Sequence, residues 1–327
     1  MRPLLRFLNP LMKQFFATLA LFIAMPVMAQ QYPNRPIRMM VPAAAAGVTD
    51  IAARVLTPRL SEALGQPVVV DNRGGAGGII GTDTVAKAAP DGYTLITAFD
   101  SFVSNPYVFK SVPYDTLNDF APISLLIRGP QIFVATPKLG VKTFNEFVAA
   151  AKAKPGSIRY ATAGAATSSR LSVELFKAVS TLDGTTIFFK GGGPALNDLL
   201  GGHVDVMIAS AGLVLPHVKS DRLHALAVSS KNRTALAPGV PSISEFYPQF
   251  EAQSWVGMLA PAATPRAIIQ RLNSEVNKVL ADAEIKERFN TLGYEIAGSS
   301  PEQFGAWLRT ETVKWSKVIR DNNITAE

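Results

Sequence analysis

The sequence predicts an α/β fold made of two blocks, in which short strands alternate with helices. Two observations lead to this prediction. Runs rich in β-branched residues, such as 37–41 and 68–71, alternate with stretches whose apolar residues recur at helical spacing. Only short breaks separate them, with no internal repeat and no low-complexity linker. Such strand–helix–strand alternation is typical of a mainly parallel sheet covered by helices.

The first block begins with the expected strand 37–41. A helix is expected over residues 50–64, because Ile51, Val55, Leu56 and Leu60 follow helical spacing. Gly65 and Pro67 end that helix. The next expected elements are a strand over 68–71, a helix over 79–87 and a strand over 94–98.

The second block begins near Gly129. Thr143 with Glu146 three residues later forms a capping box, which places a helix start at Thr143. The expected strands of this block are 131–135, 158–161, 186–189, 204–208 and 224–229. The expected helices are 143–154, 169–179 and 194–201.

From Ser254 the pattern changes again. We expect a strand over 255–259 and helices over 265–281 and 283–292. Ser300, Pro301 and Gln303 then form a strong helix start, and this last helix is expected to run to about Asn322. Because no flexible spacer separates the blocks, we expect two lobes joined by crossing strands, near Arg128 and within 228–253. Such a hinge allows lobes to close on a ligand.

The N-terminus has the features of an export signal. Arg2, Arg6 and Lys13 supply positive charge, residues 15–27 form an apolar run, and Ala29 offers a small residue for cleavage. The alternative is a retained membrane anchor, but the run is short for a span of roughly 20 residues. We therefore predict a signal peptide over residues 1–29, cleaved after Ala29, and a periplasmic protein.

Composition excludes several classes of function. Three of the 32 basic residues lie in the predicted signal, which leaves 29 basic and 25 acidic residues in the mature chain. This small excess is dispersed, so nucleic-acid binding is not expected. The chain has no cysteine and only three histidines, His203, His217 and His224, which lack the spacing of metal ligands. We expect no metal and no cofactor.

Three loops of very small residues point instead to anion binding. They are 43–50 (AAAAGVTD), 161–169 (ATAGAATSS) and 190–196 (KGGGPAL), and each follows an expected strand and opens an expected helix. The first N–H groups of a helix lack intrahelical partners, and the helix dipole is positive there. Such openings can hold a carboxylate without Arg or Lys. Several of them in one cleft would form a receptor for a small carboxylate.

Each candidate also has a simpler structural interpretation. Thr49 and Asp50 form an ordinary helix cap, with Arg54 as an ion-pair partner for Asp50. Thr167, Ser168 and Ser169 are also suited to capping a helix. Lys190 is either an anion contact or a surface lysine. Ser101 follows the strand 94–98, at the edge where open sheets have their clefts.

Two further features have interpretations of their own. Gly75, Gly77 and Gly78 with Gly81 lack the full dinucleotide-binding pattern and the acidic residue that should follow it, so a tight turn is expected there. Trp255 is interpreted as a core or hinge residue, or as a wall of the cleft.

These motifs together resemble the receptors of tripartite tricarboxylate transporters, also called the Bug family. The resemblance covers essentially all of the predicted mature chain. Beside the three loops it rests on the segments 32–37 (YPNRPI), 65–73 (GQPVVVDNR), 75–78 (GAGG), 86–95 (AKAAPDGYTL), 114–115, 119–123 (DFAPI), 199–202 (LLGG), 216–219 (PHVK), 223–228 (LHALAV) and 255–261 (WVGMLAP).

The resemblance implies a fold like that of type II periplasmic binding proteins, with two α/β lobes around a ligand cleft and a hinge of several strands. Lobe 1 would comprise residues 30–128 and 241–327, and lobe 2, inserted in it, residues 129–240. It implies a non-enzymatic extracytoplasmic receptor that delivers a small carboxylate to integral-membrane permease subunits. We expect a monomer. From the resemblance and from the loops above, the candidate ligand-binding residues are Ala43, Ala44, Gly47, Val48, Thr49, Ser101, Ala163, Gly164, Thr167, Ser168, Lys190, Gly191, Ala209 and Ser210.

The chain departs from the family pattern in two places. Ala43, Ala45 and Ala46 replace an aromatic residue, a proline and a glycine, and Ala209-Ser210 replaces an Asp-Asn pair. If the glycine of the family has a positive φ, Ala46 costs roughly 1 kcal/mol or reshapes the loop. Both departures remove bulk or polarity from the cleft. We therefore expect a ligand that is bulkier or less polar than a short amino-dicarboxylate.

Two other functions compete with transport. A sensory receptor would present the same solute to a membrane-bound kinase, and the sequence does not separate it from a transport receptor. A secreted hydrolase is disfavoured, because the chain has no Gly-x-Ser-x-Gly elbow, no cysteine and few histidines.

Overall fold

A computed structural model of the chain describes residues 32–45 and 47–326. The chain divides into two units, Met1–Asn34 and Arg35–Glu327, and the second unit contains the sheet and the helices that pack on it. The predicted signal peptide and its cleavage site lie outside the described residues, and so does Ala46.

The elements of the second unit are as follows. Its strands are β1 (Ile37–Val41), β2 (Val68–Asn72), β3 (Thr94–Phe99), β4 (Phe120–Ala135), β5 (Ile158–Thr162), β6 (Gly184–Phe188), β7 (Val206–Ser210), β8 (His224–Val228), β9 (Gln253–Pro261) and β10 (Glu295–Ile296). Its α-helices are α2 (Val48–Leu64), α3 (Ile79–Ala86), α4 (Ser101–Val108), α5 (Phe144–Ala153), α6 (Ser168–Ser180), α7 (Gly192–Gly201), α8 (Ala211–Lys219), α9 (Arg266–Ala281), α10 (Ala283–Thr291) and α11 (Pro301–Asp321). Short 3₁₀ turns lie at η2 (Ala76–Gly78), η3 (Pro137–Leu139) and η4 (Ile243–Glu245).

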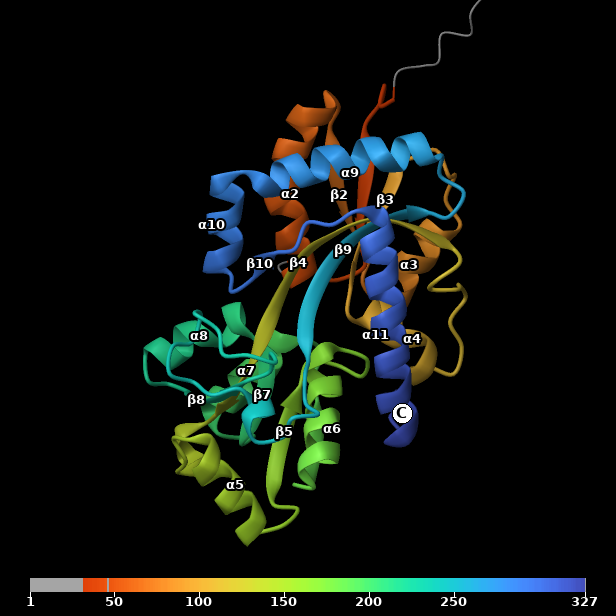
Figure 1. The fold of residues 1–327 in the computed structure, drawn as a ribbon. Coiled ribbons are helices and arrows are strands. Elements are labelled where there is room, and N and C mark those ends of the chain that lie inside the picture. Colours follow the sequence, from red (N-terminus) through yellow and green to blue (C-terminus); the bar gives the residue numbers. More distant parts are fainter. Residues whose placement is uncertain (1–31, 46, 327) are drawn as a thin grey trace, which may run out of the picture. The chain divides into compact units, whose positions relative to one another are not determined.

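The long strand β4 connects two groups of strands. Hydrogen bonds give the order β2-β1-β3-β9-β4-β7-β5-β6, with β8 and β10 also paired to β4. Residues 120–130 of β4 pair with β9, and residues 131–135 pair with β7. We call β1, β2, β3, β9, β10 and the start of β4 the first strand group. The second strand group comprises β5, β6, β7, β8 and the end of β4. Figure 1 shows β4 and β9 running side by side between them.

The sheet is mixed, which corrects the expectation of a mainly parallel one. β1 pairs in parallel with β2 and β3, and β5 does so with β6 and β7, as the strand–helix alternation predicted. The central pairings of β9 with β3 and β4, and of β4 with β7, β8 and β10, are antiparallel. Strands that return from one group to the other run in the opposite direction, and local hydrophobic spacing does not contain this information.

Helices cover both faces of the second strand group, so both sides of β4 are buried there. Successive strand residues face opposite sides of a sheet. Phe133 belongs to a core cluster with Phe147 of α5 and Phe176 of α6. Its neighbours Ile132 and Val134 belong to another core cluster, which includes residues of α7 and α8. This double burial explains why the segment is a continuous apolar run in the sequence.

The end of the chain packs against the first strand group. α9 packs against α2 and β4, while α11 packs against α4 and β4. The predicted caps are confirmed, because Thr143 and Ser300 each form a capping box at the start of α5 and α11. The return of the tail, which the sequence only suggested, therefore makes β4 and β9 the crossing strands.

Candidate functional site

A cavity of about 290 Å³ lies where the two strand groups meet. We call it the main cavity. The loops after β1, β3, β5 and β7 all reach its wall, because each of these strands ends beside it. In open α/β sheets, ligands bind in the crevice beyond the carboxyl ends of the strands. The position of the cavity is therefore that of a ligand site.

Helices α2, α6, α7 and α8 all begin at the main cavity. Their N-cap residues are Gly47, Thr167, Gly191 and Ser210, and none of these side chains caps its helix. Side-chain caps occur instead on α5, α10 and α11, which begin elsewhere. Helix α4 lacks such a cap as well, and its N-cap residue Asp100 also lines the cavity, whereas α3 and α9 lack a cap but begin elsewhere. Helix starts that lack a cap from their own N-cap side chain, together with their positive dipole ends, thus converge on one cavity, which suits an anion.

The structure brings most of the sequence-predicted candidates together. Those that line the main cavity are Ala43, Gly47, Val48, Thr49, Ala163, Thr167, Ser168, Gly191, Ala209 and Ser210. They come from all three small-residue loops and from the end of β7. The loops are far apart in the sequence and share one cavity, which is the juxtaposition that the receptor hypothesis requires.

The other candidates lie beside the cavity rather than on its wall. Ala44 is exposed, and Lys190 is an exposed residue between β6 and α7. The Ser101 hydroxyl is buried and donates a 2.9 Å hydrogen bond to the Gly77 carbonyl. Gly164 has a φ of 147°, and the Thr167 hydroxyl donates a 3.1 Å hydrogen bond to its carbonyl oxygen. These contacts shape the loops that border the cavity.

Asp50 has a structural role at the start of α2. Its carboxylate accepts hydrogen bonds from Arg54 Nε at 2.9 and 3.0 Å and from Asn72 Nδ2 at 3.0 Å. It therefore anchors the helix to β2, as the alternative interpretation of this motif expected.

Several residues of the cavity wall were not among the predicted ones. Gln131 lies where β4 changes partners, and its side-chain amide donates a 3.2 Å hydrogen bond to Ser168 Oγ. The others are Phe99, Asp100, Ser169, Gly192, Gly193, Met207, Leu213, Ser254, Val256 and Tyr294. Trp255, for which the sequence left core, hinge and cleft wall open, also lines the cavity. Five of the wall residues, Gln131, Ser254, Trp255, Val256 and Tyr294, lie in β4, in β9 or beside β10, whose antiparallel pairing had no local sequence signal. Asp100, Ser169, Gly192 and Gly193 lie directly beside residues that were predicted from the sequence or in the same small-residue loops.

The ionisable group that dominates the cavity is Asp100. Its Oδ1 accepts from the Ser168 backbone N–H, and its Oδ2 accepts from the Ser254 hydroxyl, both at 3.3 Å. Burial raises the pKa of the Asp100 carboxyl, while hydrogen bonds from Ser168, Ser254 and the Ser101 backbone oppose the shift. A raised pKa favours the neutral form of Asp100, which does not repel an anionic ligand.

Two buried donors in the wall have no partner of ordinary hydrogen-bond geometry within the described part of the chain. They are Trp255 Nε1, on a fully buried side chain, and the Tyr294 hydroxyl, on a side chain 3% exposed. Burial raises the pKa of Tyr294 to about 12, although the nearby Ser210 and Ser254 hydroxyls lower it. An unpaired buried donor costs about 1–3 kcal/mol, so a ligand acceptor would be favoured at this wall.

No lysine, arginine or histidine is among the described residues that line the main cavity. Within residues 32–45 and 47–326, no three His, Cys, Asp or Glu residues are grouped to hold a metal ion. No helix of the same residues has the length and apolarity needed to cross a bilayer. The cavity offers backbone amides, hydroxyls, one amide side chain and two ring donors.

Comparisons with known proteins agree with this geometry. The profile of a family described as "Tripartite tricarboxylate transporter family receptor" matches residues 52–324. Protein BugT of Bordetella pertussis is 38% identical over 318 residues, covering 95% of this chain and 98% of that protein.

Two solved structures are also similar. An R. palustris protein solved with adipate has a TM-score of 0.84 and 31% identity, covering 90% of this chain and 99% of that one. MatC from Rhodopseudomonas palustris with bound malate has a TM-score of 0.79 and 30% identity, covering 88% and 100%.

Proposed function

This chain belongs to the receptor family of tripartite tricarboxylate transporters, and is thus a solute receptor and not an enzyme; we propose that it binds a small carboxylate in the main cavity. The solved relatives with adipate and malate support this class of ligand. The observation that carries the proposal is the convergence of uncapped helix N-termini on a cavity whose described wall has no cation.

The carboxylate is held by partial charges and not by an ion pair. Each helix start offers N–H groups without intrahelical partners, and a carboxylate accepts such bonds strongly because it is charged. Trp255 Nε1 and the Tyr294 hydroxyl add two donors whose pairing with the ligand would remove an existing cost. Burial raises the pKa of Asp100, which favours its neutral form and so lowers the repulsion that an anion would otherwise meet.

The ligand contacts we propose come first from the predicted residues on the cavity wall. They are Ala43, Gly47, Val48, Thr49, Ala163, Thr167, Ser168, Gly191, Ala209 and Ser210. Ala44, Ser101, Gly164 and Lys190 act at the border of the same loops, where they shape the entrance. Thr49 is the strongest hydroxyl candidate, because its side chain is 4% exposed and lines the cavity at the opening of α2.

Ligand binding is coupled to closure of two lobes. We assign residues 30–128 and 241–327 to lobe 1 and residues 129–240 to lobe 2, with β4 and β9 as the hinge. β4 runs from the first strand group to the second, and β9 runs back in the opposite direction. These two crossings support the division. A ligand that contacts both lobes binds the closed form more tightly than the open form. This difference in binding free energy sets how far the equilibrium shifts to the closed form.

The closed form then delivers the ligand to membrane permease subunits, and the description of the family as a transporter receptor supports this step. We propose that the protein works in the periplasm as a monomer, after removal of residues 1–29. The charged start and apolar run of that segment support export.

The test uses protein expressed with its own N-terminal segment and purified from the periplasmic fraction. Mass spectrometry should give a chain that begins at Gln30. Calorimetric titration with malate, adipate, citrate and monocarboxylates should identify at least one ligand, and its uncharged amide should bind far more weakly. If the amide binds as tightly as the acid, or if amines bind in place of acids, the proposal is wrong.

A further inference from the structure

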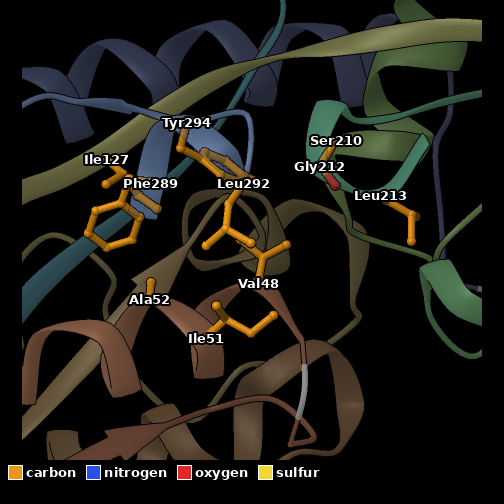
Figure 2. A pocket seen from close by; sticks show the side chains of 10 residues that line it. All are labelled: Val48, Ile51, Ala52, Ile127, Ser210, Gly212, Leu213, Phe289, Leu292 and Tyr294. Atoms are coloured by element: carbon orange, nitrogen blue, oxygen red, sulfur yellow. The ribbon is translucent and has the colours of Figure 1, made fainter. Parts of the chain in front are cut away.

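A second cavity, of about 170 Å³, adjoins the main one. We call it the side cavity, and Figure 2 shows the ten residues around it. It shares Val48, Ser210, Leu213 and Tyr294 with the wall of the main cavity. The two spaces are therefore neighbours across the start of α2, the start of α8 and Tyr294.

The walls of the side cavity are apolar. Ile51 and Ala52 come from α2, Ile127 from β4, Phe289 from α10, and Leu292 from the turn before β10. Figure 2 shows Leu292 pointing toward Val48, with Phe289 on one side and α8 on the other. None of the described residues that line this cavity is charged, in contrast to the main cavity with Asp100.

The size of the side cavity corresponds to a small apolar group. An apolar cavity of about 150 Å³ lined by leucine, isoleucine and phenylalanine stays dry and is large enough to bind benzene. The atoms that line such a space lack dispersion partners on one side. An apolar group that enters it regains those contacts and leaves water, whereas a charged group would lose its hydration.

Tyr294 lies where the polar main cavity meets the apolar side cavity. It lines both cavities, and its buried hydroxyl has no partner of ordinary hydrogen-bond geometry in the described chain. A ligand lying across this boundary would present an acceptor to the hydroxyl and apolar atoms to the ring. Tyrosine combines both surfaces in one side chain.

We propose that the side cavity is a subsite for the apolar end of the ligand, which is therefore a monocarboxylate ending in a ring or branched chain of about benzene size. This inference rests on the proposed function, because the carboxylate must occupy the main cavity. A dicarboxylate such as malate has no apolar end to place there.

The first test is a titration series with the periplasmic protein. Benzoate, phenylacetate, 3-phenylpropionate and 4-phenylbutyrate are compared with formate, acetate, propionate and butyrate, which lack the ring, and 4-methylpentanoate tests the branched alkyl end. At least one acid with an apolar end should bind about 10- to 100-fold more tightly than its shorter partner, because a buried ring or branched chain contributes on that scale. Affinity should peak at one spacer length, since the spacer must join two fixed cavities.

A pair of variants tests whether the tighter binding of acids with an apolar end comes from the side cavity. Ile51→Trp fills the space, and Ile80→Trp makes the same change on α3 at a side chain 55% exposed and away from both cavities. Ile51→Trp should reduce the affinity of the best acid to that of its shorter partner, while Ile80→Trp should leave it unchanged. Thermal unfolding midpoints of both variants show whether they are folded.

The possible outcomes separate the subsite from the receptor function. If dicarboxylates bind and no apolar end improves affinity, the subsite is refuted while the carboxylate receptor stands. If no carboxylate of any kind binds, both are refuted. If the best acid binds folded Ile51→Trp as tightly as the unmodified protein, its apolar end lies elsewhere and the subsite is refuted.

Discussion

Replacing Gly212 by alanine should weaken binding of every ligand that requires closure. Gly212 lies in the first turn of α8, in the second strand group, and faces the turn after α10, in the first group. A Cβ placed on Gly212 would lie 2.2 Å from the Leu292 carbonyl oxygen and 2.9 Å from its carbonyl carbon. Both are backbone atoms, so no side chain can rotate away.

The size of the effect follows from this contact. Ordinary van der Waals contact begins at about 3.4 Å, so α8 and Leu292 must separate by roughly 1 Å. Extra atoms in a packed contact cost about 1–3 kcal/mol, which corresponds to about a 5- to 150-fold loss of affinity when only the closed form makes the contact. We infer that α8 and Leu292 meet only when the lobes close, because the contact joins the two strand groups, so the free energy of unfolding of the ligand-free protein should change little.

Calorimetric titration of the best carboxylate checks this expectation. The matched control is Gly305→Ala in α11, where the added Cβ would meet its nearest neighbour, Pro122 Cγ, at 3.5 Å. That variant should retain full affinity. Small-angle scattering with saturating ligand should show a more open form for Gly212→Ala than for the control. Unchanged affinity in Gly212→Ala would refute the claim that this glycine contact belongs to the closed, ligand-bound form.

Three further substitutions test separate parts of the account. Burial raises the pKa of Asp100 in the folded protein, so as pH rises this carboxyl ionises first in the unfolded chain, near the ordinary value of 3.8. The free energy of unfolding should therefore fall as pH rises from that value through the folded pKa. Asp100→Asn should remove that fall in urea unfolding between pH 4 and pH 8; an identical pH profile would contradict a protonated Asp100. Trp255→Phe removes the unpaired Nε1 donor but retains a ring against Phe304. Carboxylate affinity should therefore fall about 10- to 100-fold. An unaltered Kd would mean that the indole does not contact the ligand. Ser300→Ala removes the hydroxyl that accepts from the Gln303 N–H at 3.1 Å. The free energy of unfolding in urea should fall by about 1 kcal/mol, while carboxylate affinity stays the same. A loss of affinity would contradict the view that this helix start acts apart from the cavity.

Local sequence signals predicted most elements of the fold. Strand 37–41 matches β1, and the caps at Thr143 and Ser300 fix the starts of α5 and α11, because capping depends on residues only three positions apart. Helices α4 and α8 were not predicted. Both are short, with eight and nine residues, and each contains a proline, Pro106 or Pro216. In so short a segment a proline indicates a break, whereas the longer helix α2 was predicted although it contains Pro58.

Long-range pairing was beyond local signals. The antiparallel register of β9 against β4, with Trp255 opposite Arg128, depends on a chain return over more than 100 residues. For the same reason Gln131, Ser254 and Tyr294 were not recognised as parts of the cavity wall. Residues such as Thr49 and Gly191 were recognised, because a loop of small residues before a helix is itself a local pattern.

The departures from the family pattern have different outcomes. Ala209 and Ser210 line the main cavity, and Ser210 also lines the side cavity, so the absence of an Asp-Asn pair there leaves a less polar wall. Ala43 lines the main cavity too, whereas the proposed effect of Ala46 concerns a residue outside the described chain. The expectation of a bulkier or less polar ligand remains a prediction, and the side cavity gives it a specific location.

The most direct test of the central claim is a crystal structure of the protein with its tightest carboxylate. The account predicts that the carboxylate oxygens lie in the main cavity, within hydrogen-bond distance of backbone N–H groups at the starts of α2, α6, α7 or α8, with no lysine or arginine in contact. A carboxylate paired with a basic side chain, or bound outside the cavity, would contradict it.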